Sequence, residues 1–280
     1  MTSRVSRLVT VGAPFVLLLL LLLLLPGGVA EAAGPSPAAL QSWDRYVARL
    51  EQARAADRTH AVATWATDDD PAGAAIRAAV LRGGIVVSRR ALPVAGAADA
   101  TLQHWQGSIL LRGLSLAHVA ERLRHPERFA PPPDVVTLDV SNRNDAGHDL
   151  YLRLTRSMLV SATYDTWHRV RHHPRSPTRL DSDSLATRIQ EVQDPGGPHE
   201  RLRSPDEGRG FLWRMHSYWR FSVVPDGVVA TCESITLSRP VPTGLGLVSR
   251  PVIARVARES MATALQAWQR PLATVRSSSR

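Results

Sequence analysis

The 280-residue chain has no lysine and a single cysteine, Cys232. One cysteine cannot form an intramolecular disulfide, so the fold would have no disulfide cross-link even in an oxidising compartment. Cys232 lies in an apolar run typical of a strand, which predicts a small buried side chain rather than a nucleophile. Because every basic residue is arginine in a chain rich in alanine, glycine and proline, the arginines indicate a coding bias more than a selected chemistry.

Several motifs of catalysis and nucleotide binding are also missing. The chain has no Gly-x-Ser-x-Gly elbow, no Gly-x-Gly-x-x-Gly turn, no phosphate-binding loop and no zinc-finger spacing. The formal net charge is +9, but the arginines are spread along the chain. That pattern favours a generally basic surface over nucleic-acid binding. We therefore expect no cofactor and no nucleic-acid partner.

The N-terminal segment indicates export. Arg4 and Arg7 precede an almost wholly apolar stretch at 8–25, and a small-residue cleavage pattern ends at Ala32. These features predict a signal peptide at 1–32 and a periplasmic or extracellular protein. The apolar stretch is also nearly long enough to remain as a membrane anchor, and either alternative exports the rest of the chain.

Two helices are predicted in an N-terminal extension at 33–82. Apolar residues at helical spacing predict an amphipathic helix at 38–56, namely Leu40, Trp43, Val47 and Leu50. Three aspartates before Pro71 are a helix-start signal, and this second helix is expected to end at Leu81. The aspartates could suggest a metal site, but adjacent carboxylates without partner spacing favour capping.

The remainder of the chain reads mainly as strands. Ser115 is expected to cap a short helix that ends before Pro126. Short connections between successive strands predict an antiparallel meander. The predicted strands are 85–90, 102–112, 135–142, 150–160, 163–171, 185–192, 211–224 and 228–238. Turn residues separate most of them, at 142–147, 174–177, 194–198 and 225–227.

The last predicted hairpin can be given a register. A two-residue turn at Asp226-Gly227 would place Arg220 opposite Glu233 and Trp219 opposite Ser234. Alternation would then divide the first strand into two faces. One face would carry Phe211, Trp213, Met215, Trp219 and Phe221, and the other Leu212, Arg214, His216, Tyr218 and Arg220.

A long amphipathic helix is predicted at the C-terminus, over 252–268. Its apolar positions repeat every four residues, and it needs a large apolar partner, which only the sheet can provide. We therefore predict an α+β fold in which a curved antiparallel sheet packs on this helix. The domain would span 83–271, and 272–280 would be a disordered tail.

This order of elements resembles the helix-grip fold of the START-like superfamily, which includes polyketide-cyclase-like (SRPBCC) proteins, and in particular uncharacterised exported bacterial members. Four segments carry the resemblance: Gly210–Phe221 (GFLWRMHSYWRF), Cys232–Arg239 (CESITLSR), Pro242–Gly246 (PTGLG) and Arg258–Ser260 (RES). The resemblance implies a cavity between the sheet and the C-terminal helix, and an apolar ligand. The export signal and the additional N-terminal helices depart from well-studied members.

The predicted ligand-binding residues are the apolar ones expected to face this cavity. They are Trp213, Met215, Trp219, Phe221, Val252, Val256, Met261 and Leu265. The same stripe could instead be solid core under Trp268.

Polar candidates are fewer. Glu233, Arg220 and Tyr218 could form a catalytic set if their face lines the cavity, or a structural ion pair if it does not. His168 and His172, with His173 and Asp165 nearby, could begin a zinc site, but further ligands would be required and we predict no metal.

The main hypothesis is an exported non-enzymatic protein that binds a lipid or other hydrophobic small molecule. The alternatives are a cyclase- or hydrolase-like enzyme and an envelope interaction module with a filled cavity.

Overall fold

The computed structural model describes residues 34–58, 71–92, 97–157, 161–204, 208–209, 211–240 and 246–270. The predicted signal peptide, the aspartates before Pro71 and the predicted tail lie outside this range. The helices are α2 (Pro37–Arg58), α3 (Pro71–Leu81), α4 (Leu116–Arg124), the 3₁₀ turn η1 (Pro126–Arg128) and α5 (Gly246–Ala267). The strands are β1 (Val86–Arg89), β2 (Thr101–Arg112), β3 (Val135–Asn144), β4 (Gly147–Ser157), β5 (Ser161–Ser176), β6 (Arg179–Gln193), β7 (Arg201–Leu202), β8 (Arg214–Val224) and β9 (Gly227–Ser238).

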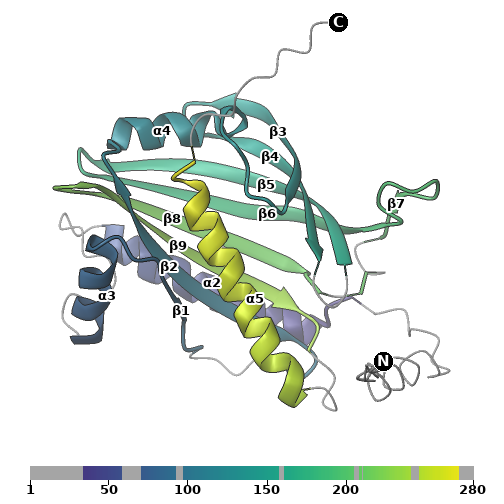
Figure 1. The fold of residues 1–280 in the computed structure, drawn as a ribbon. Helices are drawn as coiled ribbons and strands as arrows, with labels where there is room; N and C mark the ends of the chain where they lie inside the picture. The colour runs from purple at the N-terminus through teal and green to yellow at the C-terminus, as the bar shows by residue number, and fades with distance from the viewer. Residues whose placement is uncertain are drawn as a thin grey trace, which may run out of the picture.

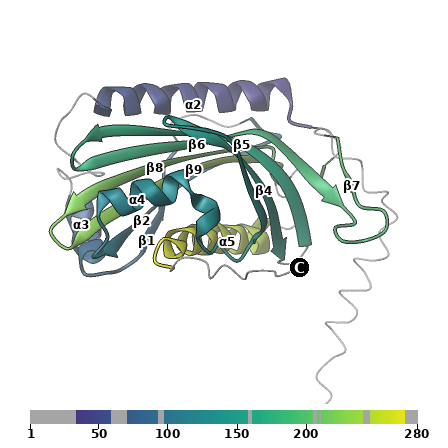
Figure 2. The ribbon, with the colours of Figure 1, turned by 90° about the horizontal axis from the view of Figure 1, so that it is seen from above.

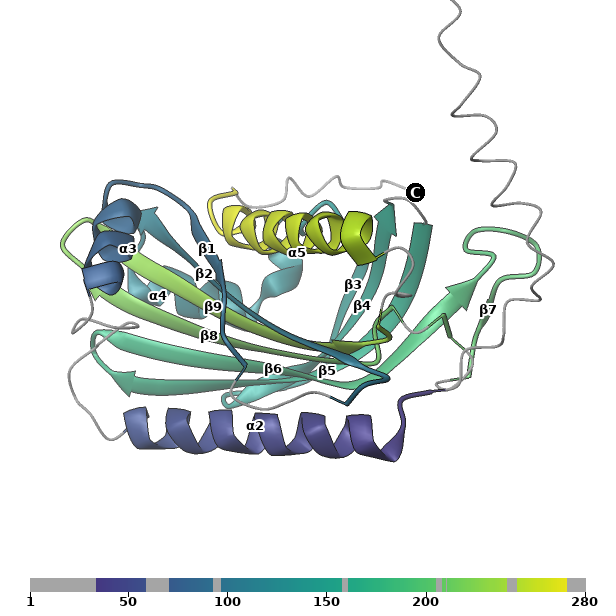
Figure 3. The same cartoon turned by 90° about the horizontal axis from the view of Figure 1, so that it is seen from below.

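The described strands form one antiparallel sheet in the order β1-β2-β9-β8-β6-β5-β4-β3, with β7 paired to β6 (Figure 1). From β3 to β9 the chain runs as a meander, and β9 then pairs with β2 along the whole of that strand. The sheet curls around α5, which confirms the predicted α+β helix-grip architecture (Figure 3). We call the face toward α5 the inner face and the opposite one the outer face.

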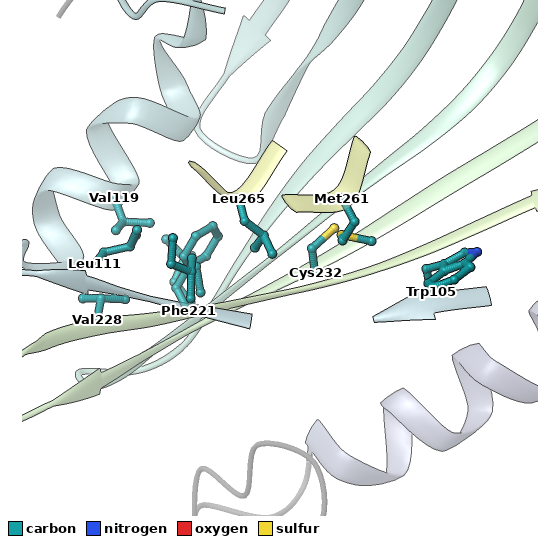
Figure 4. Packing of buried hydrophobic residues seen from close by; sticks show 11 residues of the cluster. Trp105, Leu111, Val119, Phe221, Val228, Cys232, Met261 and Leu265 are labelled. Carbon is teal, nitrogen blue, oxygen red and sulfur yellow. The ribbon is translucent and has the colours of Figure 1, made fainter. Parts of the chain in front are cut away.

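Helix α5 lies against β1, β2 and β9 rather than across the whole sheet. Met261 and Leu265 enter a core with Phe221 and Cys232 (Figure 4). Gly107 of β2 makes the close approach possible, because a Cβ atom there would lie 2.7 Å from both Leu265 Cδ1 and Met261 Cγ. Cys232 is 3% exposed, as expected of a small buried side chain, and burial raises the pKa of its thiol.

Helix α4 holds the C-terminal end of α5. Ser115 caps α4 by accepting a hydrogen bond from the His118 backbone N–H, as predicted. The Arg122 guanidinium donates to the carbonyl oxygens of Ala267, Trp268 and Arg270. The Ala267 carbonyl also accepts from the Arg270 backbone N–H, and the other two carbonyls lie past the end of α5. A cation that hydrogen-bonds this group of oxygens stabilises the helix end.

The outer face is covered by α2, which runs along it on the side opposite α5 (Figure 2, Figure 3). Its apolar side chains form a core with the outward residues of β2, β8 and β9; the members are Ala39, Trp43, Tyr46, Val47, Leu102, Trp213, Tyr218, Ile235 and Leu237. The sheet is therefore packed against a helix on each face. The predicted boundary after residue 82, between the N-terminal extension and the helix-grip domain, stays a prediction. No helix in the described part of the chain has the length and apolarity to cross a membrane.

The predicted register of the β8–β9 hairpin was wrong by two residues. Val224 pairs with Gly227, so Pro225 and Asp226 form the turn, and Glu233 lies opposite Tyr218. Proline suits the first central position of a turn. Gly227 is needed in the strand instead, since a Cβ there would lie 2.2 Å from the Leu111 carbonyl oxygen of the adjacent β2.

Two further expectations were wrong. Strand β5 continues through the predicted turn at 174–177 to Ser176, with a register shift between Pro174 and Ser176 that accommodates the missing proline N–H. Trp213 does not share the face of Trp219, because regular strand begins at Arg214 and Trp213 packs beneath α2.

A substitution at Gly107 tests the close approach of α5. Gly107→Ala should lower the free energy of unfolding by about 1–3 kcal/mol, because the methyl group overlaps Met261 and Leu265. The cost should shrink when Gly107→Ala is combined with Met261→Ala, which removes one of the two overlapping side chains. Chemical denaturation of the single and double variants measures this coupling. Strictly additive costs would contradict the packing.

Candidate functional site

The inner face away from α5 is the candidate site. Register places three serines in one row across the sheet, with Ser234 of β9 beside Ser217 of β8 and Ser217 beside Ser184 of β6. The row continues through Val170 to His148. Alternation from Cys232 and from Trp219, both of which pack with α5, places these side chains on the inner face.

Apolar side chains line the inner positions of β3 and β4. They are Leu138 and Val140 on β3 and Leu150, Leu152 and Leu154 on β4, and all five are partly exposed. The described residues of α5 contact β1, β2 and β9, which form the other side of the curled sheet. The inner face is therefore packed solid on one side and incompletely covered on the other.

The predicted ligand-binding residues divide between these two regions. Phe221 and Leu265 are fully buried and Met261 is 5% exposed, so they form core. Trp219 is partly exposed at the border of that core, where its ring stacks on Phe221 and contacts Trp268.

The other predicted members lie elsewhere. Met215 is an inner, partly exposed residue of β8, whereas Trp213 belongs to the outer core. Val252 and Val256 lie in α5, and their side chains are outside the described part of the structure.

His168 is the central polar side chain of the inner face. Its Nε2 lies 2.9 Å from Thr166 Oγ1, and its Nδ1 lies 3.3 Å from Ser184 Oγ. Thr166 Oγ1 donates its only proton to the Leu152 carbonyl oxygen at 3.1 Å. His168 must then donate to Thr166 through Nε2, and the neutral ring accepts from Ser184 through Nδ1.

The inner imidazoles are held neutral. Burial, with a smaller contribution from His216, lowers the pKa of His168 from about 6.5 to about 4. Burial and the nearby His148 lower the pKa of His172 to about 4 as well. The pKa of His148 is also lowered, chiefly by burial. At neutral pH this surface therefore presents uncharged hydrogen-bonding groups.

The histidines do not converge as metal ligands. His172 faces inward, as does His168, and its Nδ1 lies 3.0 Å from Ser182 Oγ. His173 points to the outer face, where its Nε2 lies 2.9 Å from Asp183, and Asp165 binds Arg153. Within the described ranges no group of three or more histidine, cysteine or acidic side chains could hold a metal ion.

The Ser184–His168–Thr166 arrangement has the order of a nucleophile, a base and an orienting group. However, the orienting group is a hydroxyl, which cannot compensate an imidazolium charge as a carboxylate does. An imidazole with a pKa of about 4 is also a weak base near neutral pH. This geometry suits hydrogen bonding to a ligand better than proton abstraction.

Glu233, Tyr218 and Arg220 lie on the outer face, beneath α2. Glu233 accepts from the Arg54 guanidinium at 3.2 Å, and Tyr218 donates to Glu51 of α2 at 3.0 Å. Arg220 lies 3.9 Å from Asp181. The set therefore joins a helix to the sheet and does not line the space beneath α5.

Arg54 is the residue that the sequence analysis missed. Its side chain is 8% exposed, stacks over the Tyr218 ring and also contacts Asp183 at 3.4 Å. Arg54 follows Leu50 by four residues on the apolar stripe of α2, and this spacing is the signal that could have identified it.

The solved structures that are similar to this chain share little of its sequence. No family model and no curated protein matches the chain. A STAR-related lipid transfer protein from Xanthomonas axonopodis is 16% identical over 66% of this chain and 92% of that one, with a TM-score of 0.46. Human STARD10 is 14% identical over 67% and 70%, with a TM-score of 0.40. The aromatase/cyclase Zhui from a Streptomyces species is 10% identical over 60% and 92%, with a TM-score of 0.37.

The fold is START-like. This follows from the curled antiparallel meander and the long C-terminal helix against it. At the N-terminus of the chain, α2 covers the outer face of this sheet.

The buried network of Arg54 gives a stability prediction. Arg54→Ala should lower the free energy of unfolding by about 3 kcal/mol, because Glu233 and Asp183 lose their cation beneath α2. Arg45→Ala, on the exposed side of the same helix, should change it by less than about 0.5 kcal/mol. Equal effects of the two substitutions in urea denaturation would show that the Arg54 network is not buried as described.

The inner histidine gives a pH prediction. The pKa of His168 is lower in the folded protein than in the unfolded chain. The contribution of His168 to the free energy of unfolding is therefore complete above pH 6.5 and declines as the pH falls toward 4. Between pH 7 and pH 5 the wild type should therefore lose about 2 kcal/mol more unfolding free energy than His168→Gln. The exposed control His199→Gln should behave as the wild type. Parallel pH profiles for all three proteins would contradict the burial of His168.

Proposed function

We propose that the protein is an exported, non-enzymatic binding protein that holds a lipid or another hydrophobic small molecule between the inner face of the sheet and α5. The observation that carries this proposal is the partial exposure of Leu138, Val140, Leu150, Leu152 and Leu154 at inner positions of the sheet. Covering apolar surface contributes roughly 25 cal/mol per Å².

The N-terminal segment supports export. Its positive start, apolar stretch and small-residue exit are those of a secretory signal. Retention of the same stretch would tether the domain to the membrane from which an apolar ligand is drawn. In both cases the partner is an apolar molecule of the envelope or of the surrounding medium.

The two alternative functions have less support. A cyclase- or hydrolase-like activity through Glu233, Arg220 and Tyr218 would require a set that now joins α2 to the outer face. An interaction module with a filled interior would bury the inner leucines, yet the five apolar residues named above are partly exposed.

The proposal predicts that an apolar molecule stays bound through purification. Protein isolated from its own envelope should release a near-stoichiometric apolar compound on solvent extraction, as measured by mass spectrometry. Leu152→Trp should reduce this occupancy at least about fivefold, because the larger ring fills the inner surface beside Thr166.

Thr137→Trp is the matched control, since Thr137 is an exposed outward residue of the neighbouring β3. Both variants should show the circular dichroism spectrum of the wild type, and the control should retain full occupancy. An empty wild-type protein, or equal occupancy in Leu152→Trp and Thr137→Trp, would overturn the proposed function.

A further inference from the structure

The inner face has a strip of hydroxyl and imidazole groups between its two apolar regions. We call this the hydroxyl strip; its members are Thr166, His168, Ser182, Ser184, Ser217 and Ser234. Trp219 borders it on the side of α5, and the β4 leucines border it on the other side. A molecule that spans the inner face therefore lies against apolar groups at its edges and against hydrogen-bonding groups at its centre.

Charged side chains are absent from this part of the inner face. The inward residues described at 148–154, 162–172, 180–186, 215–221 and 228–238 are all uncharged once the imidazoles are neutral. Asp183 and Glu233 point to the outer face, and the inward Glu191 of β6, which lies beyond the strip, is paired with Arg209. A carboxylate, phosphate or ammonium group would lose its hydration here and meet no opposite charge, which costs several kcal/mol.

The hydrogen bonds of His168 also fix the polarity of Ser184. The chain of donation runs from Ser184 to His168, from His168 to Thr166, and from Thr166 to the Leu152 carbonyl. The Ser184 proton is therefore occupied, and its oxygen can offer only lone pairs to a ligand. Ser184 is partly exposed, so those lone pairs are accessible from the inner side.

A plain hydrocarbon fits this surface poorly. It would cover Ser184 and its neighbours without replacing the hydrogen bonds that these hydroxyls make with water, at about 1–3 kcal/mol for each group left unpaired. A ligand hydroxyl that donates to Ser184 removes that cost and can accept in turn from a rotatable serine hydroxyl. The strip thus favours oxygen functions on an otherwise apolar molecule.

We infer that the ligand is an uncharged apolar molecule bearing a hydroxyl group, and that this hydroxyl donates a hydrogen bond to Ser184 within the hydroxyl strip. The inference rests on the proposed function and narrows its ligand class. Fatty-acid anions, amines and phospholipid headgroups are excluded from the strip by charge, and ethers are disfavoured because they have no proton to donate.

Displacement of the neutral dye Nile red tests the inference. Four competitors share one chain and differ only at the end: dodecan-1-ol, its methyl ether, dodecanoate and dodecylamine. The alcohol should displace the dye from the wild-type protein at a concentration about tenfold lower than the two ions, and about fivefold lower than the ether. Ser184→Ala should reduce the preference of the alcohol over the ether to near unity, whereas Ser141→Ala, an exposed control, should leave it unchanged.

The replacement of the imidazole provides the directional test. His168→Phe releases the Ser184 proton, so Ser184 can donate to the ether and the preference for the alcohol should fall about fivefold. If Nile red does not bind the wild type, the proposed function itself fails. If the dye binds but the alcohol displaces it at the same concentration as the ether and the ions, the inference fails and the proposed binding of apolar molecules stands.

Discussion

The structure depends on the contact between one helix and one glycine. Gly107 lets Met261 and Leu265 of α5 approach β2 with no Cβ between them. Arg122 then fixes the end of the same helix through three carbonyl oxygens. With α5 held against β1, β2 and β9, the curled remainder of the sheet keeps its inner leucines and serines partly uncovered. The position of the helix thus determines which part of the inner face stays accessible.

The second constraint comes from the opposite side of the sheet. Helix α2 buries Trp43 and Tyr46 on the outer face, and Arg54 joins it to Glu233 and Asp183. With Glu233 and Asp183 in this outer layer, the hydroxyl strip of the inner face carries only uncharged groups. The separation explains how one β-strand can carry Glu233 for structure and Ser234 for the inner surface.

Much of the architecture was predictable because it follows from local patterns. The four-residue repeat at 252–268, the Ser115 cap and the strand runs with short turns led to the correct fold class. The hairpin register was not predictable, since Pro225-Asp226 and Asp226-Gly227 are both acceptable turns and only the crowding of Gly227 against Leu111 decides between them. Trp213 was misplaced because alternation was extended one residue beyond the regular strand.

The candidate site was harder to predict than the fold. Phe221 was predicted to bind ligand because it is aromatic, but it belongs to the core. Nothing in the sequence marks Ser184 and Ser217 as site residues, because only the pairing of their strands places them in one row. The most direct test is a crystal structure of the protein purified from its own envelope. The account predicts continuous density for a small molecule along Leu150, Leu152 and Leu154 with an oxygen atom at Ser184. Side chains of α5 packed directly onto these leucines, with no density between them, would contradict it.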